Sequence, residues 1–327
     1  MVIPHVAVEV FAIPPPSLAM PYRWHRRWGE YLKSLFRRFD VVVVYFLHDW
    51  GFTADILQHG CLIASPRGSD LVPPPGEGPP SPELVAKRVE LLRSAASVGV
   101  AGPSFARVVA DFAGLPYDRI DRLPLGVDLD QFRPRKGPVR EGQRVGFFKG
   151  FRPVYGARCL VQSIAAILAE RPNTKFELMG DGPDLEPCQD LAARLGVTHA
   201  IRWLARRPHD QVPCWLNECD LTVMPSVCES FGLAALESSA MQVPVVASKV
   251  GGVLDTVQHE RTGLLVPPGC PESLAGAVVS LLKDDHRRER LGKTGRDWVQ
   301  EQYEWHRVLG HWEKVFEKAK DRVSVCV

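Results

Sequence analysis

The sequence lacks any arrangement of cysteine and histidine that is typical of a metal or redox site. Its eight cysteines are scattered, none of them forms a Cys-x-x-Cys pair, and none has the histidine spacing of a zinc site. Scattered single thiols are typical of reduced proteins of the cytosol. We therefore expect neither a disulfide framework nor a structural zinc site.

Long apolar segments are also missing. No apolar run approaches the roughly 20 residues that a membrane-spanning helix needs. The N-terminus does not have the charged and then apolar layout of a signal peptide. These absences predict a cytoplasmic protein that is neither secreted nor integral to a membrane.

A large excess of one charge is absent too. The formal net charge is +2 and no basic block covers a whole face, so nothing indicates a nucleic acid partner. Residues 22–39 are a local exception, because apolar residues including tryptophans recur there at helical spacing and arginines fill the other faces. Such a helix can lie on the inner face of an anionic membrane. The simpler interpretation is a helix packed on a sheet with a solvated basic face.

Short apolar runs do alternate with amphipathic segments along the whole chain. This alternation is typical of parallel sheets covered by helices, and 327 residues are enough for two such cores. Residues 133–142 are rich in proline, lysine and glycine and form the best linker candidate. The clearest runs are residues 41–47, 145–148, 175–179, 221–224 and 243–247. We predict an α/β fold of two doubly wound domains.

The most informative stretch is residues 225–237, where an apolar run ends and a helix begins. Pro225 and Ser226 end the predicted strand, and strong helix formers start at Leu233. The first N–H groups of a helix have no partner and lie at the positive end of its dipole, so they bind anions such as phosphate. Gly232 would let a ligand approach the backbone. The stretch therefore predicts a phosphate site.

Two carboxylates flank this predicted anion site. Glu229 lies beside it and would repel a phosphate unless it had another role. Glu237 lies two helical turns further on, roughly 12 Å away at 1.5 Å per residue. Since carboxylates accept hydrogen bonds from hydroxyl groups, the arrangement suggests a ligand of the form sugar, diphosphate, ribose. The alternative is a pair of solvated carboxylates, which are favoured near helix starts in any case.

The second half of the chain resembles the retaining glycosyltransferases of family 4, which have the GT-B fold of two facing Rossmann-like domains. The resemblance covers roughly residues 123–284, and its motifs follow one another in the family's order. They are residues 124–128 with 132–134, 149–156, 180–183, 225–237 with the spacing Glu229-x7-Glu237, 244–247, 251–252 and 262–266.

The resemblance implies a role for each matching residue. Glu229 would contact hydroxyl groups of the donor sugar, Glu237 the ribose of the nucleotide, and Lys149 the diphosphate as it leaves. His48, at the end of an earlier predicted strand, would face the catalytic cleft or form a polar pair with Asp49. The other residues implied to bind the donor are Arg152, Tyr155, Gly180, Leu204, Ser230, Phe231, Gly232 and Leu233.

The donor half departs from the family's pattern at one position. A second cation normally lies six residues after the first, and this sequence carries Tyr155 there. Either Arg152 or Arg158 would supply the missing charge, or Tyr155 would donate a hydrogen bond to the phosphate instead.

The acceptor half departs more strongly. The family often places a histidine in the loop held here by residues 67–70, and this sequence carries Arg67. Arg67 would hold an anionic group of the acceptor or pair with Asp70. No Gly-Gly loop precedes Gly126, so we expect the first sheet to be abbreviated.

These observations predict three regions and one activity. Residues 1–138 would form the acceptor-side domain, 139–302 the donor domain, and 303–327 a helix that crosses back to the first domain. The activity would be metal-independent, retaining transfer of a hexose from a nucleoside diphosphate sugar to a glycan or lipid-linked acceptor, with no cofactor. Asp128-Leu129-Asp130 spells a metal-binding pattern, but an Asp-rich turn explains it more simply. A nucleotide-sugar epimerase and a non-catalytic nucleotide-binding subunit are the alternatives, and the oligomeric state stays open.

Overall fold

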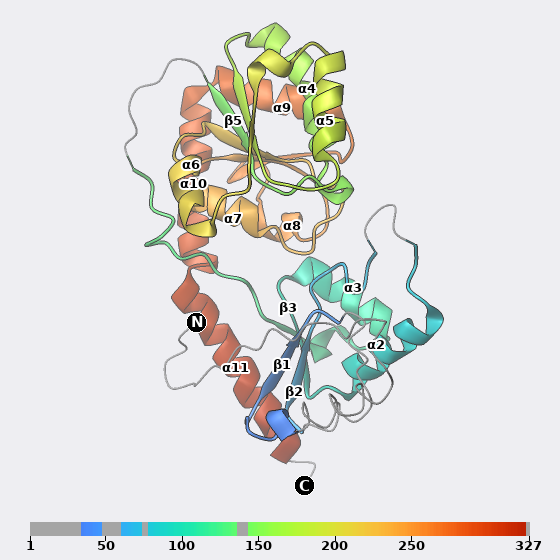
Figure 1. Cartoon of the computed structure of the whole chain (residues 1–327). Coiled ribbons are helices and arrows are strands. Elements are labelled where there is room, and N and C mark those ends of the chain that lie inside the picture. Colours follow the sequence, from blue (N-terminus) through green and yellow to red (C-terminus); the bar gives the residue numbers. More distant parts are fainter. Residues whose placement is uncertain (1–33, 48–59, 74–77, 136–142, 325–327) are drawn as a thin grey trace. The chain divides into compact units, whose positions relative to one another are not determined.

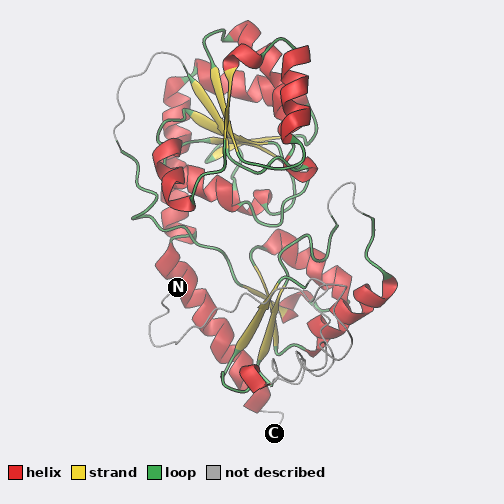
Figure 2. Cartoon of the chain, in the orientation of Figure 1, coloured by secondary structure: helices red, strands yellow, loops and turns green. Residues whose placement is uncertain are grey.

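The computed structural model describes residues 34–47, 60–73, 78–135 and 143–324 (Figure 1). The chain forms two compact units. The first comprises residues 1–73, 77–124 and 308–327, and the second comprises residues 74–76 and 125–307. In each unit helices cover a parallel sheet (Figure 2), so the predicted α/β fold with two parallel-sheet domains is confirmed. The boundaries at 138 and 302 that the sequence suggested for functional domains remain a prediction.

The first unit contains a four-stranded sheet in the order β1-β2-β3-β4. All of its pairings are parallel. Among the described residues, α2 lies between β2 and β3 in the sequence, and α3 lies between β3 and β4. The bounds are β1 (Val42–Tyr45), β2 (Leu62–Ser65), α2 (Pro82–Ser94), β3 (Ser97–Val100), α3 (Pro103–Ala113) and β4 (Ile120–Arg122).

Alternate residues of these strands face opposite layers of helix. Leu62 and Ala64 belong to the cluster that contains Leu91 of α2 and Val109 of α3. Ile63, between them, belongs to a second cluster with residues of the final helix, α11 (Trp305–Ser324). Strands buried on both faces read as continuous apolar runs, and this explains the lack of alternation in the sequence.

The second unit contains six parallel strands in the order β10-β9-β8-β5-β6-β7. The strand order therefore reverses between β5 and β8, which pair directly. The strands are β5 (Arg144–Phe147), β6 (Lys175–Met179), β7 (Ile201–Leu204), β8 (Leu221–Met224), β9 (Val245–Ser248) and β10 (Gly263–Val266). The helices are α4 (Ala157–Glu170), α5 (Leu185–Arg194), α6 (Val212–Leu216), α7 (Leu233–Ala240), α8 (Val253–Thr256), α9 (Pro271–Lys283) and α10 (Asp285–Gln302).

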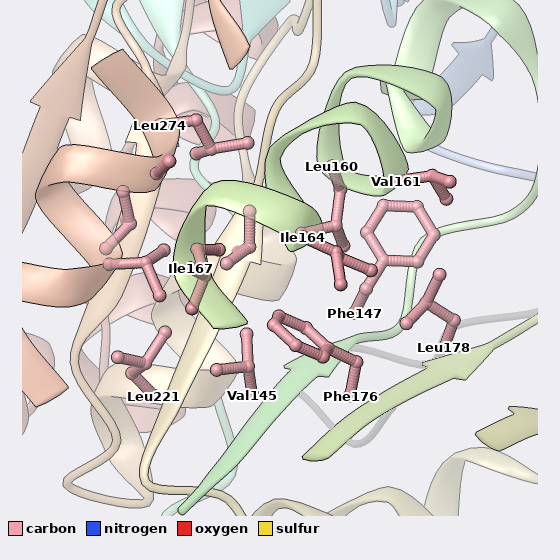
Figure 3. Packing of buried hydrophobic residues seen from close by; sticks show 14 of the residues in the cluster. Val145, Phe147, Leu160, Val161, Ile164, Ile167, Phe176, Leu178, Leu221 and Leu274 are labelled. Atoms are coloured by element: carbon pink, nitrogen blue, oxygen red, sulfur yellow. The ribbon is translucent and has the colours of Figure 1, made fainter. Parts of the chain in front are cut away.

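The main core of this unit lies between the sheet and helices α4 and α9 (Figure 3). Leu160, Ile164 and Ile167 recur along α4 at spacings of four and three and pack against Phe147 and Phe176 of the strands. Each such side chain contributes about 1.5–3 kcal/mol when fully buried. This core fixes β5 and β8 side by side, and the loops that follow them are therefore held together.

Two predictions concern residues beyond those described. His48 lies outside the described residues. Residues 22–33, which make up most of the predicted basic helix, lie outside them too. Neither the proposed role of His48 nor the membrane-facing helix is tested by the structure.

Candidate functional site

The candidate site lies where the strand order of the second unit reverses. The loops that follow β5 and β8 leave the carboxyl ends of two adjacent parallel strands. In open α/β sheets this switch point is where ligands bind. The loops that follow β6 and β9, the next strands outward on each side, border the same edge of the sheet.

Backbone hydrogen bonds join these loops to one another. Val227 N–H donates to Val154 O at 2.9 Å, which joins the loop after β8 to the loop after β5. Phe151 N–H donates to Asp181 O at 2.7 Å, and Gly252 N–H donates to Glu229 O at 2.8 Å. Because these N–H and C=O groups are paired between loops, the rim of the site is held in one arrangement.

Gly156 and Gly252 permit close approaches of this kind. A Cβ at Gly156, whose φ is +68°, would lie 1.9 Å from the carbonyl oxygen of Pro225. A Cβ at Gly252 would lie 2.2 Å from the carbonyl oxygen of Ser230. Only glycine leaves room for backbone to meet backbone at these distances.

Lys149 and Glu229 form an ion pair at the centre of the site. Lys149 Nζ lies 2.6 Å from Glu229 Oε2, and the two side chains are only 14% and 12% exposed. Lys149 comes from the loop after β5 and Glu229 from the loop after β8, 80 positions further along the chain. The lysine neutralises the carboxylate that sequence reasoning found out of place beside a phosphate site.

Tyr155 lies on another side of the same lysine. Lys149 Nζ lies 4.5 Å from the centroid of the Tyr155 ring. A ring face carries partial negative charge and attracts a cation. The residue that replaces the expected second cation therefore contacts the first one.

Glu237 is held by a histidine that the sequence did not indicate. His209 Nε2 donates to Glu237 Oε1 at 2.8 Å, and the carboxylate side chain is 9% exposed while the histidine is 61% exposed. Burial raises the pKa of Glu237, and the hydrogen bond from His209 and the charge of Lys149 both lower it. The ring of His209 lies 5.3 Å from that of Phe132, which fixes its position further.

A cavity of about 190 Å³ opens beside this pair. Asp128 is among its lining residues, and its Oδ1 accepts from the N–H groups of Asp130 and Gln131, as expected of an Asp-rich turn. The cavity is lined by Gly126, Val127, Asp128, Gln131, Phe132, His209, Leu233, Glu237 and Trp305. The lining therefore combines a buried carboxylate with apolar side chains, a combination that suits a ligand with both hydroxyl groups and a flat ring.

Helix α7 begins at Leu233 beside the Lys149–Glu229 pair. Its N-cap is Gly232, with φ of +95°, and no side chain caps its first N–H groups. Phe231 is buried with its ring edge-on to Tyr303, at 5.8 Å between centroids. Its side chain is therefore part of the core. Ser230 is half-buried next to it.

The remaining predicted donor residues lie on neighbouring loops. Gly180 N–H donates to Leu204 O at 3.0 Å, and a Cβ at Gly180 would lie 2.7 Å from Lys149 O. The structure thus brings Gly180 to the loop that carries Lys149, and Leu204, the last residue of β7, lies beside Gly180. Arg152 lies on that loop too, and its side chain is exposed.

The described residues also bear on membranes and metals. None of their helices has the length and apolar character required to cross a bilayer. In the same residues no group of three or more His, Cys, Asp or Glu side chains is arranged to hold a metal ion.

Comparison with known proteins points to one family. The family model described as "Glycosyl transferases group 1" matches residues 130–298. The chain is 32% identical over 206 residues to a GDP-mannose-dependent alpha-(1-6)-phosphatidylinositol monomannoside mannosyltransferase of Mycobacterium tuberculosis, which covers 58% of this chain and 54% of the relative. It is 32% identical over 237 residues to a D-inositol 3-phosphate glycosyltransferase of Thermobispora bispora. This match covers 67% of this chain and 55% of the relative. The chain spans about half the length of these curated relatives.

The fold is shared with solved structures at lower identity. Sucrose-phosphate synthase from Thermosynechococcus elongatus matches with a TM-score of 0.78 at 21% identity, covering 94% of this chain and 80% of that one. The predicted GT-B fold class is thereby confirmed.

Proposed function

This chain belongs to the group 1 glycosyl transferases, and on that premise we propose that it transfers a hexose from a nucleoside diphosphate to a glycan or lipid-linked acceptor. We propose further that the sugar keeps its anomeric configuration and that no metal ion is needed. The relative named as GDP-mannose-dependent supports a nucleoside diphosphate sugar as the donor.

The observation that carries the proposal is the Lys149–Glu229 pair at the start of α7. Transfer breaks the bond between the sugar and the diphosphate, so negative charge grows on the leaving phosphate. Lys149 and the uncapped N–H groups of α7 offer fixed positive charge at one place. Preorganised charge of this kind stabilises a transition state by several kcal/mol, of the order of 2.7–4 kcal/mol for one donor.

The two carboxylates have separate tasks in this proposal. Glu229, next to the cation, accepts hydrogen bonds from hydroxyl groups of the donor sugar. Glu237, in the cavity with His209 and Phe132, accepts from the ribose, and the apolar side chains of the cavity lining border the rest of the nucleoside. A protein that supplies cations and helix N–H groups to the diphosphate does not require a metal for that purpose.

Product analysis tests the proposal. The full chain is first screened by thermal shift against nucleoside diphosphates, because a ligand at 100 times its Kd stabilises by about 2.7 kcal/mol. The sugar forms of the best ligand are then incubated with lipid and glycan acceptors, with and without a chelator. We expect an acceptor-bound sugar with its anomeric configuration unchanged, in equal yield with the chelator.

Other outcomes would reject parts of the proposal. An epimerised donor formed without any acceptor would identify an epimerase. Nucleotide binding with neither transfer nor donor hydrolysis would identify a non-catalytic subunit. An inverted product would exclude retention, and loss of yield with the chelator would exclude metal independence.

Two substitutions at Tyr155 separate its possible roles. If the ring holds Lys149 in place, Tyr155→Phe should keep kcat within about twofold, while Tyr155→Ala should lower it about tenfold, as the loss of a partly desolvated cation–π contact predicts. If instead the hydroxyl group donates to the phosphate, the phenylalanine variant should fall as far as the alanine variant. Steady-state kinetics with the donor varied distinguishes these results.

Removing His209 should shift the pH dependence of nucleotide binding. Burial already raises the pKa of Glu237 and His209 lowers it, so His209→Ala should raise that pKa further. The ionised carboxylate would then be lost at a higher pH as the solution is acidified, and the Kd of a nucleoside diphosphate should rise earlier on the acid side than in the native chain. Calorimetric titrations between about pH 5 and 8 measure this. Glu237→Gln, which has no charge to lose, should abolish the difference, and parallel pH profiles for His209→Ala and the native chain would contradict the assignment.

A further inference from the structure

The loop after β2 in the first unit carries Arg67, an arginine whose guanidinium packs against an aromatic ring. The guanidinium Cζ of Arg67 lies 4.3 Å from the centroid of the Tyr45 ring. Both of its terminal nitrogens, Nη1 and Nη2, are buried, and neither has a hydrogen-bond partner in the part of the chain that the structure describes. Burial lowers the pKa of Arg67, and the nearby Tyr45 and Asp70 oppose that shift.

Asp70 is the obvious partner for this arginine, but its oxygens are used elsewhere. Asp70 Oδ2 accepts from the N–H of Leu47 at 2.7 Å. Asp70 Oδ1 accepts from the N–H groups of Arg67 at 2.9 Å and of Gly68 at 2.8 Å. The carboxylate thus shapes the loop and joins it to the end of β1, through backbone groups rather than through the guanidinium.

Buried guanidinium nitrogens without hydrogen-bond partners are unfavourable, and a folded protein seldom keeps them without a use. A guanidinium presents planar, parallel donors that match two oxygens of one phosphate or carboxylate. The Tyr45 ring restricts the movement of these donors, since the guanidinium lies against it.

The position in the fold also suits a ligand. Tyr45 is the last residue of β1, and Arg67 follows the end of β2, its parallel neighbour. Both residues therefore lie at the carboxyl ends of adjacent strands, the edge at which open α/β sheets bind ligands.

We propose that Arg67 and Tyr45 form a subsite for an oxyanion, a phosphate or carboxylate group carried by the acceptor. The identification of the ligand as the acceptor depends on the proposed function, whereas the anion subsite itself depends only on the first unit. The acceptor would accordingly be an anionic molecule and not a neutral glycan.

Three related sugars test the subsite on the full chain. Glucose 6-phosphate and glucuronate carry the two kinds of oxyanion, and glucose carries neither. We expect one or both anionic sugars to raise the thermal midpoint in a saturable manner, and glucose at the same concentration to leave it unchanged. Arg67→Met should abolish the shift, and Arg67→Lys should weaken binding about tenfold, because a lysine retains the charge without the planar pair of donors.

The methionine variant gives a second readout that needs no ligand. Removing a guanidinium whose buried nitrogens have no hydrogen-bond partner among the described residues should raise the midpoint of the free chain, by about 2 °C for a unit of this size. An arginine with a purely structural role would give the opposite result, a fall in the midpoint. Such a fall together with an unchanged response to the anionic sugars would overturn the proposal, and so would failure of both anionic sugars to bind the native chain.

Two further arms separate this subsite from the donor site and from a membrane. Lys149→Ala should leave the response to anionic sugars intact, and Arg67→Met should leave nucleoside diphosphate binding intact. If anionic sugars bind through Arg67 while no nucleoside diphosphate binds, the proposed function fails and the subsite stands.

Vesicle binding separates a lipid headgroup from a soluble acceptor. A lipid headgroup would be assigned if the native chain cosediments with phosphatidylglycerol vesicles but not with phosphatidylcholine vesicles, and if Arg67→Met loses this cosedimentation. Binding of the soluble sugars alone would assign it to a soluble acceptor.

Discussion

Replacement of Lys149 by alanine is expected to lower kcat for sugar transfer by about 10³-fold, the upper end of the effect of removing one preorganised donor that stabilises developing negative charge. Binding of nucleoside diphosphates should weaken as well, while binding of the nucleoside without phosphates should not change. Steady-state kinetics and calorimetry with these two ligands measure the two effects.

Two causes add together in this variant. The alanine removes the cation that lies at the start of α7, and it leaves Glu229 without the partner that is 2.6 Å away in the native chain. Because the glutamate side chain is only 12% exposed, little water can replace the lysine. The free carboxylate would then repel the incoming diphosphate.

A double variant separates the two causes. In Lys149→Ala combined with Glu229→Gln the repulsion is absent, so nucleoside diphosphate binding should recover most of its affinity while kcat stays low. Activity of the single variant within tenfold of the native chain would exclude Lys149 from the role proposed for it.

The second large effect is expected from Gly156→Ala. The substitution places a Cβ 1.9 Å from the carbonyl oxygen of Pro225, so the loops after β5 and β8 must separate. It also puts a side chain on a residue with φ of +68°. The clash and the strained backbone together should lower the free energy of unfolding by about 3 kcal/mol or more. Nucleoside diphosphate binding should be lost as well.

Gly196 supplies the matched control. Its φ is +69°, and a Cβ there would meet nothing within 4 Å. Gly196→Ala therefore isolates the cost of the left-handed backbone, about 1–2 kcal/mol, and should leave nucleotide binding unchanged. Urea unfolding of both variants gives the comparison. If both variants lost the same free energy of unfolding, the close approach of Gly156 to Pro225 would add nothing to the cost of the substitution.

Local sequence signals predicted the elements around the site well. Residues 221–224 were expected to form a strand and are β8, and the helix expected from Leu233 is α7. Small shifts have a physical cause: the strand expected at residues 243–247 begins at Val245, because the preceding Pro244 has no N–H to pair. The glycosyltransferase family indicated by the motifs is confirmed by the match over residues 130–298.

Local sequence signals could not predict the contacts between loops that are distant in the sequence. Lys149 and Glu229 were each singled out, but their pairing depends on β5 and β8 being neighbours, which is a property of the strand order. His209 was missed for the same reason, since its only local context is a short turn after Pro208 and its partner lies 28 positions away. The sequence predicted that Arg67 either binds an anion or pairs with Asp70. The hydrogen bonds that Asp70 accepts from backbone N–H groups could be known only from the folded loop.

The ion pair between Lys149 and Glu229 also has a consequence for the order of events during turnover. On the proposed function, Lys149 can form an ion pair with the diphosphate only if other groups replace it as the partner of Glu229. The hydroxyl groups of the attached sugar do so by donating hydrogen bonds to the carboxylate. A donor should therefore be held more firmly than the nucleoside diphosphate that remains after transfer. Once the sugar has left, Glu229 competes again for Lys149, so the same contact that keeps the resting site neutral would help to expel the spent nucleotide.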